Sequence, residues 1–140
     1  MVRQPAVAGA FYPANAAVLR QTIRELLKSS VALGETEQPK ALIAPHAGYI
    51  YSGPVAGQAY AQLIAQAEVI RRVILLGPVH RVPVRGLALP KADRFATPLG
   101  EVPVDQEAIR RLTGMPQVVV SEAAHAFEHS LEVQLPFLQS

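Results

Sequence analysis

The spacing of apolar residues near the N-terminus predicts an amphipathic helix over residues 15–30. Leu19, Ile23 and Leu26 recur at intervals of three and four residues, so they fall on one face of such a helix. Asn15 comes before the first turn, where its side chain can accept hydrogen bonds from the backbone N–H groups that have no partner within the helix. We therefore expect one face of this helix to pack on the core.

Two short runs further along the chain, residues 41–44 and 73–76, are apolar at every position. This pattern is typical of strands that are covered on both faces. Residues 53–70 between them show a helical pattern, with Pro54 expected in the first turn, where a missing N–H costs nothing. A strand, a helix and a strand in this order predict a right-handed βαβ unit with parallel strands. The pattern thus predicts the α/β class, as a three-layer, mostly parallel sheet with helices on both faces.

Three further segments extend the predicted fold. Residues 86–89 and 117–120 are expected to be strands because they are short, apolar and bounded by turn residues. Residues 105–112 are expected to form a helix that Asp105 caps at the start and Gly114 ends.

The last predicted helix covers residues 128–139, where Leu131, Leu135 and Leu138 recur at helical spacing. Pro136 fits poorly inside it, because a proline in a helix removes one backbone hydrogen bond and costs about 3 kcal/mol. The alternative is a later start, at about Leu135, which would place Pro136 near a first turn.

Both strands of the predicted βαβ unit are followed by a proline and then a histidine. Pro45 and His46 follow the first strand, and Pro78 and His80 follow the second. Because parallel strands end at the same edge of a sheet, where open α/β sheets bind ligands, we expect the two imidazoles to lie close together. Such a pair can bind a divalent metal ion or act as acid and base. The plainer alternative is that each ring only hydrogen-bonds a loop.

A catalytic metal site commonly has three protein ligands. The candidates for the third are His125, Glu128, His129 and Glu132. His129 and Glu132 are three residues apart, so they would share one face of the predicted helix, turned toward the cleft at the strand ends. The alternative interpretation is a solvated helix start, where a carboxylate is favoured by the positive end of the helix dipole.

Composition narrows the function classes. The 140 residues are 50% hydrophobic and 17% charged, enough to form the core of a single domain over residues 1–140. The formal net charge of +2, without any run of Lys or Arg, does not indicate a nucleic-acid surface. The absence of cysteine excludes disulfides and cysteine-bound zinc within this sequence. No stretch is long enough to span a membrane, so we expect a cytoplasmic protein that binds neither nucleic acid nor membranes.

Five stretches, in this order, resemble the Memo family, which is called AmmeMemoRadiSam system protein B in prokaryotes. They are VAGAFYP, IAPHAGYIYSGPVAGQAY, VILLGPVHRVP, TPLGEVPVD and HSLEVQLPFL. The resemblance covers essentially the whole chain and implies a fold similar to LigB-like class III extradiol dioxygenases, which use non-heme iron(II). It also implies metal binding, of iron(II) or copper, by His46 and His80, a redox-related role, and association with AMMECR-type and radical SAM proteins. The dioxygenase activity of the family is not established.

The chain departs from the family pattern in two places. Where many members have Gly-Pro-Ser-His-His, this chain has Arg81 directly after His80, so a ligand at that position is lost. The remaining site residues of the family, a cysteine and a histidine, lie in a C-terminal half, whereas this sequence stops at Ser140 within an apolar helical pattern. We therefore expect an inactive N-terminal fragment, with the third metal ligand beyond Ser140.

Two function classes remain open. In the first, the protein is a non-heme, metal-dependent oxidoreductase in which His46 and His80 hold the metal, and His129 and Glu132 are the candidate catalytic residues. In the second, it is an interaction module that reuses a dioxygenase-like scaffold without turnover. Two histidines with one carboxylate would favour oxygenase chemistry, whereas completion by a cysteine would argue against it. In isolation the fragment is expected to be oligomeric or aggregation-prone, because missing strands expose a sheet edge and an apolar face.

Overall fold

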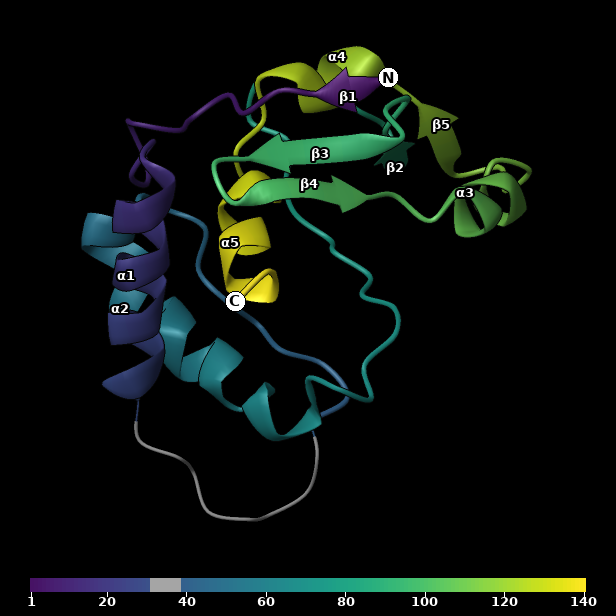
Figure 1. The fold of residues 1–140 in the computed structure, drawn as a ribbon. Helices are drawn as coiled ribbons and strands as arrows, with labels where there is room; N and C mark the ends of the chain where they lie inside the picture. The colour runs from purple at the N-terminus through teal and green to yellow at the C-terminus, as the bar shows by residue number, and fades with distance from the viewer. Residues whose placement is uncertain (31–38) are drawn as a thin grey trace.

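The chain folds into helices and two small β-sheets in a computed structural model that describes residues 1–30 and 39–140 (Figure 1). The predicted α/β class is confirmed. One sheet has the order β1-β3-β4, formed by Val2–Arg3, Arg94–Thr97 and Gly100–Pro103. β1 and β3 are parallel, whereas β3 and β4 are antiparallel. The other sheet pairs β2, Leu87–Leu89, with β5, Val118–Val120, in parallel.

The two helices predicted from apolar spacing and capping residues are observed close to their predicted positions. α1 covers Ala16–Lys28, and the Asn15 side chain accepts hydrogen bonds from two backbone N–H groups of its first turn, as expected. α3 covers Gln106–Leu112, and Asp105 caps it in the same way. α1 buries Leu19 and Ile23 completely, because these side chains lie on its apolar face.

The helix that follows the first histidine differs from the prediction. α2 covers Tyr49–Ala61, with a short 3₁₀ turn, η1, at Ile64–Gln66. It begins four residues earlier than expected, so Pro54 lies inside the helix and not in its first turn. Its small residues pack on α1 and not on a sheet. A Cβ atom at Gly57 would lie 2.6 Å from the backbone oxygen of Leu26, so only glycine allows this approach.

The predicted βαβ unit is wrong. Residues 41–44 and 73–76 have no regular secondary structure and belong to neither described sheet (Figure 1). Their main-chain groups make no hydrogen bond with another described residue. Apolarity at every position is typical of a strand that is covered on both faces, but a strand also requires a neighbour to complete its backbone hydrogen bonds. The observed sheets come in part from β1, β3 and β4, which the pattern did not predict.

The C-terminal region is also divided more finely than predicted. Residues 128–139 do not form one helix but contain a 3₁₀ turn, η2, at Glu132–Gln134 and the helix α5 at Leu135–Leu138. They are preceded by a further helix, α4, at Glu122–Ala126. Pro136 therefore lies in the first turn of α5, which confirms the alternative of a late start. α5 contacts both α1 and α2. No helix in the described part of the chain has the length and apolarity needed to cross a membrane.

Candidate metal centre

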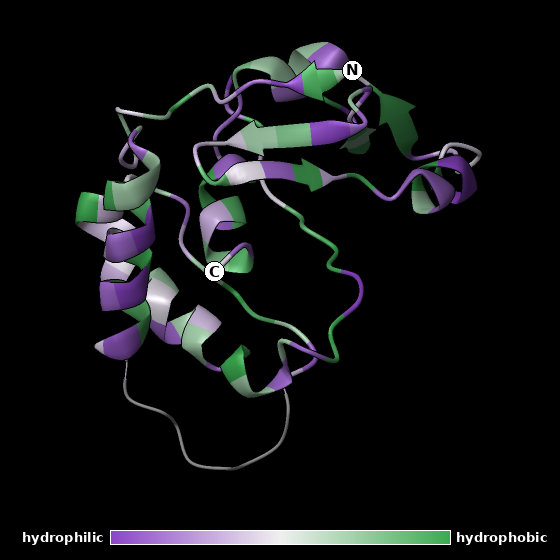
Figure 2. Ribbon diagram, in the orientation of Figure 1, coloured by the Kyte–Doolittle hydropathy of each residue, from purple (hydrophilic) through white to green (hydrophobic). Residues whose placement is uncertain are grey.

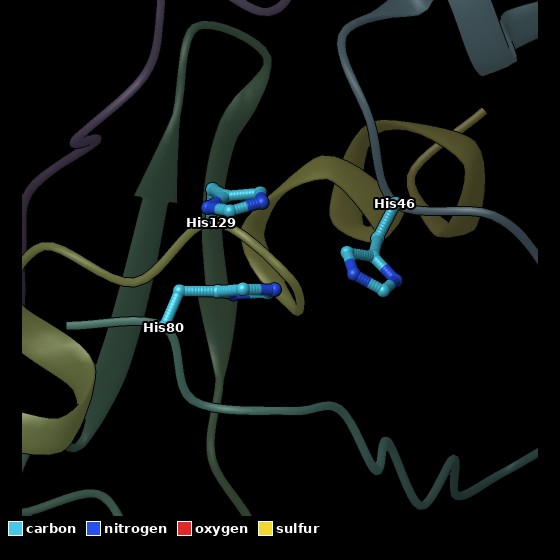
Figure 3. A group of neighbouring side chains, drawn as sticks. All are labelled: His46, His80 and His129. Atoms are coloured by element: carbon cyan, nitrogen blue, oxygen red, sulfur yellow. The ribbon is translucent and has the colours of Figure 1, made fainter. Parts of the chain in front are cut away.

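Three histidines from distant parts of the chain meet at one place (Figure 3). One ring nitrogen from each of His46, His80 and His129 lies within 4.8 Å of the other two. The rings of His80 and His129 stack, with 4.6 Å between their centroids. The His46 ring faces them from a separate loop, with its centroid 5.4 Å from that of His80 and 5.9 Å from that of His129. The predicted approach of His46 and His80 is confirmed, and a third imidazole joins them.

Residues 128–134, between α4 and α5, hold the two loops that carry the other histidines. The Gln134 side-chain amide donates a hydrogen bond of 3.1 Å to the backbone oxygen of Pro45. The Ser130 hydroxyl donates one of 2.8 Å to the backbone oxygen of Pro78. Each loop is thus tied, through a proline carbonyl, to the same segment. This arrangement brings the loops together without the shared sheet edge that the sequence pattern predicted.

Glu128 fixes the His80 ring. Its carboxylate accepts hydrogen bonds from the backbone N–H (2.6 Å) and from Nδ1 (2.9 Å) of His80. It also accepts from the backbone N–H groups of His129 and Ser130, each at 2.9 Å. Burial by itself raises the pKa of Glu128, but the hydrogen bonds outweigh it and lower the pKa to about 2. The charged carboxylate requires Nδ1 of His80 to be the donor, which leaves Nε2 available to the histidine group.

The His129 ring is partly buried and packs against Phe11, with 4.7 Å between the ring centroids. Burial lowers the pKa of His129, and the neighbouring imidazoles and Arg81 lower it further, against the opposing effect of Glu128. A lowered pKa favours the neutral imidazole at physiological pH. Neutral imidazole is the form that binds a metal ion.

Glu132 lies apart from the histidines. The residue is only 1% exposed, and its carboxylate forms a buried ion pair with Arg3. It also accepts hydrogen bonds from the Tyr12 hydroxyl (2.5 Å) and from the backbone N–H groups of Ala6 (2.8 Å) and Val7 (3.0 Å). This carboxylate therefore anchors the N-terminal segment to the C-terminal one.

The predicted shared face of His129 and Glu132 is not observed. It required a continuous helix from residue 128, but regular α-helix starts only at Leu135. His129 therefore points into the histidine group, while Glu132 points to the N-terminal segment. The position of the carboxylate gives no support to a catalytic role for Glu132.

The fourth histidine, His125, is also separate from the group. Its Nε2 lies 2.9 Å from the backbone oxygen of Ala88, and its ring meets the Phe95 ring edge-on. Burial lowers the pKa of His125, and Arg3 adds to this effect. The Ala88 carbonyl and Glu128 act in the opposite direction but do not cancel the shift.

We predict that the metal-free protein loses stability as the pH falls from 7.5 to 5.5. The unfolded chain takes up protons near the ordinary histidine pKa of 6.5, whereas the lowered pKa values of His125 and His129 make the folded chain resist protonation. Glu128 does not contribute in this window, because its stabilising effect is lost only below the ordinary glutamate pKa of 4.5. Urea unfolding at several pH values measures how steeply the free energy of unfolding changes with pH. This pH dependence should be weaker in His125→Gln. If the pH dependence in that variant is the same as in the unmodified chain, His125 does not contribute to it.

The sequence analysis missed the roles of Ser130 and Gln134. Both side chains are buried and polar, and they lie four residues apart in a segment otherwise rich in leucine and valine. A buried polar side chain needs a hydrogen-bond partner, so polar residues within an apolar pattern are the signal that could have found them. Glu128 was among the candidate ligands, whereas the structure shows it holding a ring.

The structure thus shows an α/β fold in which three imidazoles from separate segments gather at one place. A family model described as Memo-like protein matches residues 3–140, and the chain belongs to that family. The MEMO1 family protein of Aquifex aeolicus is 42% identical over 140 residues, which are 99% of this chain and 49% of that protein. Those of Ignicoccus hospitalis and Archaeoglobus fulgidus are each 43% identical, over 99% of this chain and 52% and 49% of their own lengths. The chain spans about half the length of the curated relatives it matches.

Proposed function

We propose that this protein binds one transition-metal ion, iron(II) or copper, through His46, His80 and His129, in a redox-related role. The observation that supports the proposal is the convergence of three ring nitrogens within 4.8 Å. Metal–nitrogen distances of about 2.0–2.1 Å in a tetrahedral site place the ligand nitrogens about 3.4 Å apart. The ligand nitrogens, which lie within 4.8 Å of one another, would therefore have to move closer together on binding.

The donor set also fits such an ion. Neutral imidazoles suit iron, copper, zinc and nickel, and an ion bound in this way supplies Lewis acidity or electron transfer. The set differs from the two-histidine, one-carboxylate triad of non-heme iron oxygenases, because the nearby carboxylate of Glu128 is engaged by four hydrogen bonds. With His129 in the group, a ligand from beyond Ser140 is not needed to reach three.

Titration of the 140-residue chain with iron(II) under anaerobic conditions, and separately with copper(II), tests the proposal. We expect one ion per chain by calorimetry and elemental analysis. His46→Ala and His80→Ala should each weaken binding beyond the roughly 10–100-fold typical when a group that only orients a ligand is removed. His125→Gln is the matched control, because it changes the histidine outside the group. Affinity that stays the same in His46→Ala and His80→Ala would refute the shared site.

Glu128→Gln should weaken metal binding by about 10–100-fold, because the neutral amide cannot accept all the hydrogen bonds that hold the His80 ring and its loop. Glu122→Gln is a suitable control, since Glu122 is exposed on α4. Titration of both variants with the same ion measures the difference. Equal affinities would show that His80 needs no carboxylate to hold it.

A further inference from the structure

Residues 73–76 are all apolar, as the hydropathy colouring of the ribbon shows (Figure 2), and Val73, Ile74 and Leu76 are exposed. Ile74 is 81% exposed and Leu76 is 77% exposed, whereas Leu75 between them packs against the core cluster around Phe95. This alternation of outward and inward side chains is that of a β-strand. The main-chain N–H and C=O groups of residues 71–77 make no hydrogen bond within the described part of the chain.

Residues 41–44 repeat this arrangement. Ile43 is fully exposed, whereas Leu42 and Ala44 pack against the core cluster around Leu19. Their main-chain groups also lack hydrogen-bond partners among the described residues. Two segments with the sequence and side-chain alternation of strands therefore pair with no strand in the described part of the chain.

A hollow of about 760 Å³ adjoins residues 73–76. It lies between two separate clusters of core residues, since its lining includes Tyr60 and Phe137 of one cluster and Phe95 and Leu135 of the other. Domains usually have one contiguous core, and protein interiors leave few voids larger than a water molecule. Apolar side chains placed in this hollow would join the two clusters into one core.

We infer that the hollow and residues 73–76 bind polypeptide, namely the half of a Memo-like protein that this chain does not match. The relatives carry about as much additional chain as the part that aligns here, because the alignment covers 49–52% of their lengths. A polypeptide strand supplies the backbone partners that residues 71–77 do not find among the described residues, whereas a small apolar ligand leaves these groups unpaired. This inference does not depend on metal binding.

The experiment combines the 140-residue chain with the unmatched half of the Aquifex aeolicus relative and, in parallel, of the Archaeoglobus fulgidus relative. Light scattering after size exclusion should show a one-to-one complex with at least one of them. Hydrogen exchange read by mass spectrometry should be at least about tenfold slower for the amides of residues 71–77 in the complex than in the chain alone.

The double variant Ile74→Asp with Leu76→Asp should lose the complex while the chain alone keeps its melting temperature, because both side chains are exposed. Val18→Asp, at a 53% exposed position of α1 outside the hollow, is the matched control and should keep the complex. The inference is overturned if neither half slows exchange at residues 71–77, or if the double variant binds as well as the control. It is also overturned if the chain alone forms a stable homodimer that protects these amides.

Discussion

Replacing Glu132 by alanine is expected to lower the free energy of unfolding by about 3–5 kcal/mol, the cost of removing one partner of a buried ion pair. The change leaves the Arg3 guanidinium, whose side chain is 7% exposed, without its carboxylate. It also removes the acceptor for the Tyr12 hydroxyl and for the backbone N–H groups of Ala6 and Val7. Urea unfolding monitored by circular dichroism measures the loss.

Glu107→Ala is the control for this prediction. Glu107 pairs with Arg111 four residues along α3, but both side chains are more than half exposed, so we expect a change of less than about 1 kcal/mol. Removing both members of the buried pair, in Arg3→Met with Glu132→Ala, should recover part of the loss, because no unpaired charge then remains buried. Similar losses for Glu132→Ala and Glu107→Ala would show that the buried pair does not anchor the N-terminal segment.

Replacing His129 by alanine is expected to weaken metal binding as strongly as His46→Ala or His80→Ala. The three ring nitrogens are mutually close, so removal of any one leaves only two ligands from the described residues. His129→Ala should also lower the folding stability, because the side chain is only 16% exposed and its ring packs against Phe11. Calorimetric titration beside His125→Gln separates the two effects. Unchanged affinity in His129→Ala would place the third ligand elsewhere.

The sequence predicted the features of the fold that depend on neighbouring residues. The helix spacing at Leu19 and Ile23 and the caps at Asn15 and Asp105 were all confirmed, because they involve contacts within one or two turns. Strand pairing depends on segments far apart in the sequence, so apolarity at residues 41–44 and 73–76 could not reveal that they pair with no strand among the described residues.

At the candidate site, too, the contacts between distant residues could not be predicted from the sequence. The convergence of His46 and His80 was predicted, but from a sheet edge shared by residues 41–44 and 73–76, which belong to neither described sheet. The loops meet because Ser130 and Gln134 bind the carbonyls of Pro78 and Pro45, contacts that span 52 and 89 residues. His129 joins the histidine group, whereas Glu132 binds Arg3. Sequence spacing alone could not predict this difference, because it depends on where the helix begins.

X-ray absorption spectroscopy of the chain loaded with one equivalent of iron(II) or copper(II) tests the three-histidine site most directly. We predict imidazole scattering from three nitrogen ligands at about 2.0–2.1 Å, with one imidazole lost in each of His46→Ala, His80→Ala and His129→Ala. The spectrum of His125→Gln should match that of the unmodified chain. Oxygen ligands without imidazole scattering, or a spectrum that none of the three alanine variants changes, would contradict the site.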